Sequence, residues 1–97
     1  MTVVQMLDFI PDYKNYKINV YTEINNKLIC ENFNKEINTV TGQREVKLLR
    51  ISYETINLGQ VIPVINFVVD GSYELRKIQE LFREQVENKI KLKYKWL

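Results

Sequence analysis

The sequence has no histidine and only one cysteine, three glycines and two prolines in 97 residues. Without histidine, the chain lacks the commonest metal ligand and general base of enzymes. The single cysteine, Cys30, excludes an internal disulfide and is typical of a reducing compartment. Few glycines and prolines predict short loops. No apolar run approaches the roughly 20 residues of a membrane-spanning helix, so we expect no membrane partner.

Charge is distributed unevenly along the chain. The net charge is +2, but residues 89–97 (KIKLKYKWL) contain four lysines and no acidic residue, and so contribute +4. The remainder therefore carries −2, the difference between these two values. Any attraction for a polyanion should be local and not a property of the whole surface. The length, with 45% hydrophobic and 27% charged residues, predicts a single domain over residues 1–97.

Residues 89–96, within the segment 89–97, alternate strictly between lysine and an apolar or aromatic residue. A period of two is typical of a strand with one buried and one exposed face. A continued helix would instead place Lys93 in line with Leu75, in the middle of the preceding apolar stripe. We therefore expect the helix to stop near Asn88 and a final strand to follow. The side chains expected to face the core are Ile90, Leu92, Tyr94 and Trp96.

The first elements of the chain have clear local signals. Thr2-Val3-Val4-Gln5 fits a capping box, with Thr2 as the N-cap and Gln5 reaching back. The short helix that follows should end before Pro11. Residues 18–24 and 27–33 read as a hairpin, with a turn at Asn25-Asn26, because asparagine tolerates positive φ.

The second half of the chain predicts two more strands and a long helix. Residues 44–53 read as a strand with a bulge near Leu48-Leu49, where the apolar side changes. Residues 61–69 are apolar on both faces, which is typical of a central strand. Ser72 is the expected N-cap of a helix over residues 73–88. Its apolar stripe consists of Leu75, Ile78, Phe82 and Val86, with Glu80, Glu84 and Glu87 opposite.

These elements together predict an α+β fold. We expect a short N-terminal helix, a mostly antiparallel sheet of about five strands, one long helix packed on one face of that sheet, and a C-terminal strand. The polar segment at residues 34–43 should be the most mobile loop.

The same residues argue against an enzyme. The acidic side chains are scattered, and no spacing places two of them on one rigid face directed into a cleft. Cys30 has no histidine base and is expected to act as a small buried hydrophobic residue. Asp70-Gly71-Ser72 lacks the glycine-rich run of a phosphate loop and reads as a helix cap. We expect no catalytic, metal-binding or cofactor-binding residues and no cofactor.

The candidate contact residues are polar or basic and come from the final strand and from the segment around residues 34–43. They are Lys89, Lys91, Lys93, Lys95, Asn38, Thr39, Thr41 and Arg44. On one strand face such lysines would repeat about every 6.6 Å, near the spacing of phosphates along a nucleic acid. If all four lysines contacted phosphates, the logarithm of the binding constant would fall with the logarithm of the salt concentration with a slope of about −3.6. The structural alternative is that the lysines keep an exposed edge from pairing with other chains.

The opening of the chain carries one resemblance. Residues 2–12 (TVVQMLDFIPD), followed by a strand at residues 16–21, resemble the short-helix-then-strand start of small phage and mobile-element accessory proteins. The resemblance implies an accessory protein that binds host or phage macromolecules, a group that includes inhibitors of bacterial defence systems. It implies the cytoplasm of a bacterial host cell and no particular site residue.

Three functional hypotheses remain open from the sequence. The first is a non-enzymatic binding protein of phage or mobile-element type that occludes a protein partner, such as an acidic surface or a host defence nuclease. The second is direct nucleic-acid binding through the C-terminal lysines. The third is a small virion structural or homo-oligomeric subunit whose final strand pairs across a subunit boundary.

Overall fold

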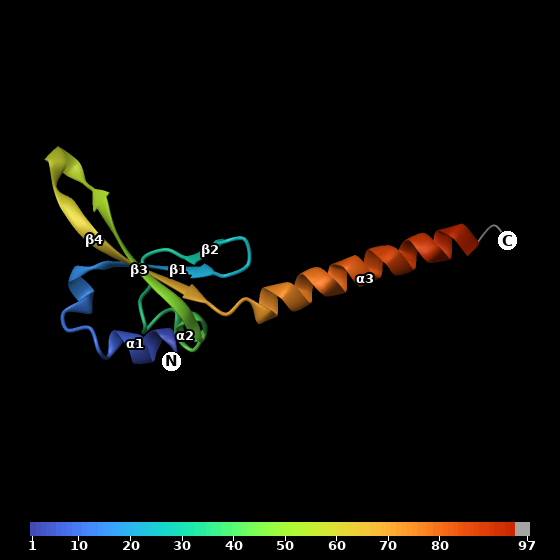
Figure 1. The fold of residues 1–97 in the computed structure, drawn as a ribbon, viewed down its shortest axis with the longest axis horizontal. Coiled ribbons are helices and arrows are strands. Elements are labelled where there is room, and N and C mark those ends of the chain that lie inside the picture. The colour runs from blue at the N-terminus through green and yellow to red at the C-terminus, as the bar shows by residue number, and fades with distance from the viewer. Residues whose placement is uncertain (95–97) are drawn as a thin grey trace.

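The computed structural model describes the backbone of residues 1–94 and the side chains of residues 1–89. Figure 1 shows a head, built from the chain up to the last strand, and one long helix that projects from it. The elements in chain order are α1 (Val3–Leu7), η1 (Tyr13–Asn15), β1 (Lys17–Thr22), β2 (Leu28–Cys30), α2 (Thr39–Gly42), β3 (Val46–Thr55), η2 (Asn57–Gly59), β4 (Val61–Val69) and α3 (Ser72–Tyr94). The fold class is α+β, as predicted.

The sheet is mixed and has four strands in the order β2-β1-β4-β3. β1 pairs with β4 in parallel, and the β1–β2 and β3–β4 pairs are antiparallel. The expectation of a mostly antiparallel sheet of about five strands was therefore wrong. The prediction that residues 61–69 form a central strand is confirmed. Because β4 is apolar on both faces, it is best buried between two neighbours, and the parallel pair with β1 provides that position.

One face of the sheet carries the core. Alternate residues of β1 and β4 point to this face, and they meet side chains from α1 and from the loop after β2. The buried cluster consists of Val3, Leu7, Ile18, Val20, Phe33, Ile65, Phe67 and Val69. α1 and α2 lie beside the sheet in Figure 1 and form the second layer of the head.

The local signals of the first half of the chain are confirmed. Thr2 and Gln5 form the reciprocal capping box, and α1 ends before Pro11. Asn25 and Asn26 have φ values of 58° and 51°, as the predicted turn requires. The strand register shifts between Val46 and Leu48, close to the predicted bulge.

α3 differs most from expectation. Its backbone stays helical to Tyr94, so the predicted stop near Asn88 and the strand from residue 89 were wrong. The final residues 95–97, which include Lys95 and Trp96, lie outside the described residues. The expected packing of the helix on the sheet was also wrong, because α3 leads away from the head along the long axis of the molecule (Figure 1).

The error has a physical reason. A strand from residue 89 was expected because a lysine at position 89 or 93 of a continued helix would lie in the apolar stripe of α3. That placement is unfavourable only if the stripe is buried. A helix that stands in solvent imposes no such penalty, because a lysine beside an exposed stripe keeps its charge in water. The Cα radius of gyration is 19.1 Å, whereas a compact domain of this length would have about 13 Å.

Candidate partner-binding surface

α3 is fixed to the head through its first turn. The Arg44 guanidinium donates to both carboxylate oxygens of Glu74, at 2.6 and 2.7 Å, and to the carbonyl oxygen of Asp70 at 2.5 Å. The Glu23 carboxylate accepts a hydrogen bond from the Gly71 N–H at 3.0 Å. The hydrogen bonds from Arg44 lower the pKa of Glu74, and the same pair raises the pKa of Arg44. This joint sets the direction in which the helix leaves the head.

The start of α3 is capped by a different residue from the one predicted. The Asp70 carboxylate accepts hydrogen bonds from the Ser72 N–H, at 2.7 Å, and from the Ser72 hydroxyl. Ser72 is already helical, so its predicted role as N-cap was wrong. The hydrogen bonds from Ser72 lower the pKa of Asp70, because they stabilise the charged carboxylate.

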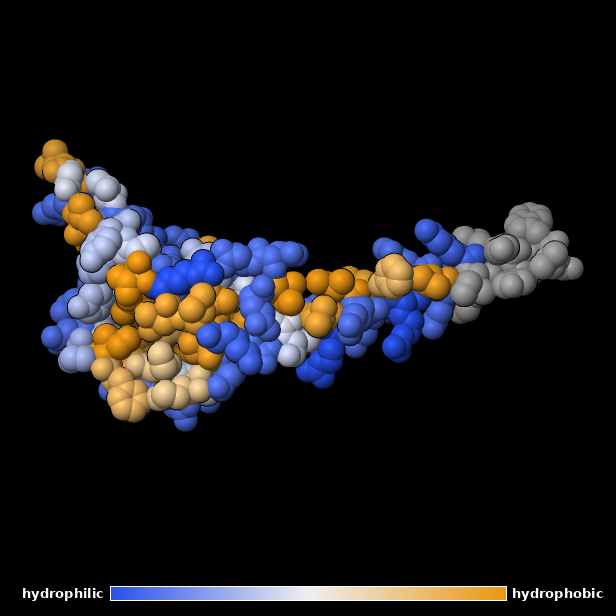
Figure 2. Space-filling model, in the orientation of Figure 1, coloured by the Kyte–Doolittle hydropathy of each residue, from blue (hydrophilic) through white to orange (hydrophobic). Residues whose placement is uncertain are grey.

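The apolar stripe of α3 is present as predicted but is exposed. Phe82 and Ile78 keep 67% and 49% of their surface accessible, and Leu81 keeps 60%. Ile78, Phe82 and Val86 form one continuous apolar face of the helix. Figure 2 shows this line of apolar residues along the helix, with no other part of the described chain covering it on the visible face. The predicted stripe is therefore a surface and not part of the core.

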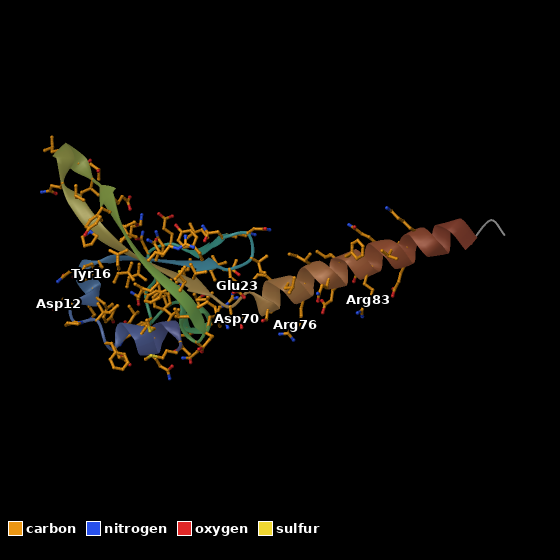
Figure 3. All side chains as sticks on the ribbon, in the orientation of Figure 1. Asp12, Tyr16, Glu23, Asp70, Arg76 and Arg83 are labelled. Atoms are coloured by element: carbon orange, nitrogen blue, oxygen red, sulfur yellow. The ribbon has the colours of Figure 1, made fainter. Side chains whose placement is uncertain are left out.

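Charged residues are arranged regularly around the stripe. Arg76 and Arg83, seven residues apart, project from the same side of α3 (Figure 3). Arg83 borders the apolar face together with Gln79 and Glu87. At about 100° per residue, Glu80 and Glu84 lie on the side opposite Phe82. Arg76 and Arg83 therefore lie along one side of the apolar face, Glu80 and Glu84 lie behind it, and Glu87, predicted on the opposite side, borders the face beside Arg83.

The predicted lysine row does not form on a strand. Lys89 is exposed on α3, and the backbones of positions 91 and 93 are also helical. Lys95 lies outside the described residues. Backbone positions two residues apart are rotated by about 200° around a helix axis and separated by about 3 Å along it. The regular 6.6 Å spacing expected of a strand is therefore absent over residues 89–94.

The other predicted contact residues lie in the head. Asn38 accepts a hydrogen bond from the Asn34 N–H at 2.9 Å and precedes α2, which contains Thr39 and Thr41. Arg44 is held in the joint with Glu74 and is therefore not a free cation. The position of Lys89 is about 22 Å along α3 from Glu74. The structure therefore does not bring the two predicted groups together.

A second exposed apolar region lies on β3 and the turn that follows it, and it was not predicted from the sequence. Ile51 and Tyr53 are 54% and 73% exposed, and Leu48 and Ile56 are 47% and 40% exposed. The alternating apolar residues of this strand were the signal in the sequence. They were expected to be covered, because we predicted a further strand and a long helix packed on the sheet. α1 has only five residues and does not reach the far end of the β3–β4 hairpin (Figure 1).

The remaining chemistry of the described residues is limited. Burial raises the pKa of the Cys30 thiol, which is the opposite of what an activated nucleophile needs. Residues 1–89 hold no cluster of three or more potential metal-binding side chains. In the same part of the chain, no helix has both the length and the apolar composition needed to cross a bilayer.

Comparison with protein-family models, with curated proteins and with solved structures found no match for this chain.

Proposed function

We propose that this chain is a non-enzymatic protein-binding protein of the phage or mobile-element accessory type, and that it docks α3 into a groove of another protein. The observation that carries the proposal is the exposed stripe of α3. Leu75, Ile78, Phe82 and Val86 repeat at helical spacing yet remain 38–67% exposed. An amphipathic helix with anchors at this spacing is a common way to fill a hydrophobic groove.

The energetics favour a covered stripe. Full burial of one large apolar side chain is worth about 1.5–3 kcal/mol, and five such side chains lie along α3 when Leu81 is included. Contiguous apolar surface of this kind is typical of interaction sites and not of free surfaces. Phe82, the largest and among the most exposed of the five, is the natural central anchor.

The charges around the stripe define the chemistry of the partner. Arg83 borders the apolar face next to Glu87, and Arg76 extends from the same side of the helix (Figure 3). A complementary groove would therefore be apolar at its floor and acidic along its rim. An acidic groove on the surface of a host defence nuclease, outside its basic nucleic-acid channel, would have this character, and α3 would occupy it.

Photo-crosslinking tests the proposal at single residues. We would replace Phe82 with benzoylphenylalanine and compare it with a matched chain that carries the same group at Glu84, on the opposite side of α3. The proposal predicts protein adducts from position 82 in host cells and few from position 84, because only the first position faces the partner.

A second pair of variants gives the control for folding. In both variants benzoylphenylalanine replaces Leu75. The double substitution Ile78→Glu and Phe82→Glu should abolish the adduct from this position, whereas the double substitution Glu80→Gln and Glu84→Gln should leave it intact. Equal adduct yields from positions 82 and 84, or an adduct that survives charges in the stripe, would contradict docking through this face.

A further inference from the structure

β3 is an edge strand whose outer side is mostly open. At its start, the Val46 N–H donates to the Met1 carbonyl oxygen at 2.8 Å, and the Val3 N–H donates to the Arg44 carbonyl at 3.1 Å. Beyond Val46, no segment of the described chain pairs with this edge. The strand is ten residues long and contains no proline. Of the devices that keep long edges from pairing with other chains, it has only the bulge near its start and the charged side chains of Lys47, Arg50 and Glu54.

The hydrogen bonds within the hairpin identify the free backbone groups. The Ile56 N–H donates to the Gln60 carbonyl oxygen at 2.7 Å across the turn between β3 and β4. In an antiparallel pair, residues that bond to the partner strand alternate with residues that point away from it. The odd-numbered residues from 49 to 55 therefore carry their N–H and C=O groups on the open edge.

The side chains of β3 form a palindrome around Ser52. Two positions away on either side lie Arg50 and Glu54, which share a face of the sheet with Ser52. One position away on either side lie Ile51 and Tyr53, which share the other face. Four positions away lie Leu48 and Ile56, both exposed. A strand with this pattern is complementary to itself when it is reversed.

We propose that two copies of this chain pair through the open edges of β3, antiparallel and with Ser52 opposite Ser52 of the second copy. In this register Arg50 faces Glu54 twice, and Ile51 faces Tyr53 twice. Cross-strand pairs of opposite charge and aromatic–branched pairs are the favourable ones in sheets. The two sheets become one continuous sheet, and the interface has the two-fold symmetry of most homodimers.

Other registers lose these pairs. A shift by two residues in one direction places Arg50 opposite Ser52 and leaves Glu54 opposite an apolar residue, Leu48. The ion pair between Glu54 and Lys17, at 2.9 Å, is compatible with the proposed register. A carboxylate has two oxygens with several acceptor sites, so it can accept from Lys17 and from Arg50 of the second copy together.

The interface is separate from the stripe of α3, so each dimer would present two copies of that helix. A partner with two or more grooves would then be bound with higher avidity than by a single helix. The far half of the β3–β4 hairpin, which projects from the head in Figure 1, would pair along its open edge with the same hairpin of the second copy.

Disulfide trapping in a Cys30→Ala background tests both the interface and its register. Ser52→Cys should form a disulfide-linked dimer under mild oxidation, because opposite residues in a pair without hydrogen bonds have Cα atoms about 4.5 Å apart. Arg50→Cys and Glu54→Cys should each form no disulfide-linked dimer alone and should form a mixed disulfide when combined. Circular dichroism of each variant verifies that it is folded.

Sedimentation equilibrium measures the same association without a disulfide. The unmodified chain should show a mass twice that of the monomer at high concentration, and Arg50→Glu should lower the association constant about tenfold or more by placing like charges opposite each other. The stripe variant Ile78→Glu with Phe82→Glu should remain dimeric.

Three outcomes would overturn the inference. The first is a monomeric mass throughout the concentration series. The second is failure of the folded Ser52→Cys variant to cross-link. The third is a dimer that dissociates in the stripe variant, which would locate the interface on α3. None of these results depends on whether α3 docks into another protein.

Discussion

At the scale of single residues, the joint between Arg44 and Glu74 decides where α3 points. Both side chains are largely buried, with 20% and 22% of their surface accessible. The pair is bidentate, and Arg44 also holds the carbonyl of Asp70. Such geometry is more rigid than an ordinary surface ion pair, because a planar fork meets two oxygens at once. A small number of atoms thus orients a helix of 23 residues.

The joint should loosen in acid. Because Arg44 lowers the pKa of Glu74, the stabilisation is fully present above the ordinary pKa range of glutamate and is lost as the pH falls through the lowered value. We expect a contribution of about 1 kcal/mol. NMR relaxation of the Leu75 and Ile78 amides should report greater mobility at low pH.

Glu74→Gln is the matched control for this titration. It removes the charge and preserves the shape, so its first helical turn should be mobile at every pH, with only the weaker contribution of Asp70 left to titrate. The account of the joint would be contradicted if the glutamine variant kept the rigidity and the pH dependence of the unmodified chain.

Local sequence predicted some of these residues and not others. The Thr2–Gln5 capping box depends on a spacing of three residues and was readable directly. Arg44 and Glu74 are 30 residues apart, and nothing in the local pattern pairs them. Arg44 was therefore predicted as a free contact residue, although the fold uses it to hold α3.

At the scale of elements, periodicity predicted the type of most segments but not what covers them. The apolar stripe of α3 was correctly located, yet the pattern is the same for a helix that packs on its own sheet and one that awaits a partner. The end of the helix was misplaced for the same reason, since lysines were excluded from the stripe only on the expectation that the stripe is buried. Likewise, the alternation in β3 predicted a strand but did not reveal its open edge.

α3 should contribute little to the stability of the head. Removal of residues 78–97 keeps Glu74 and the joint, so we expect the free energy of unfolding of the head to change by no more than about 0.5 kcal/mol. Urea denaturation followed by circular dichroism measures this change.

Leu7→Ala provides the scale for that experiment. Leu7 is 1% exposed, and loss of a buried leucine side chain should cost about 2–5 kcal/mol. A truncation that destabilised the head as much as Leu7→Ala would mean that α3 packs against the sheet, contrary to the exposed stripe.

At the scale of the whole molecule, two projections extend from a small head: α3 and the far half of the β3–β4 hairpin (Figure 1). The principal extents are 67 × 31 × 22 Å. Both projections expose apolar side chains. A chain of this shape buries less of its own surface than a compact domain of equal length, so surfaces of other chains are expected to complete it.

The proposed docking of α3 requires above all that this helix stands clear of the sheet. Small-angle X-ray scattering of the Arg50→Glu variant, in which pairing through β3 should be weakened, measures this property on the monomer. We predict a radius of gyration close to the 19.1 Å of the structure. A value near 13 Å, as for a compact domain of this length, would mean that α3 folds back and covers its own stripe, and would contradict the account.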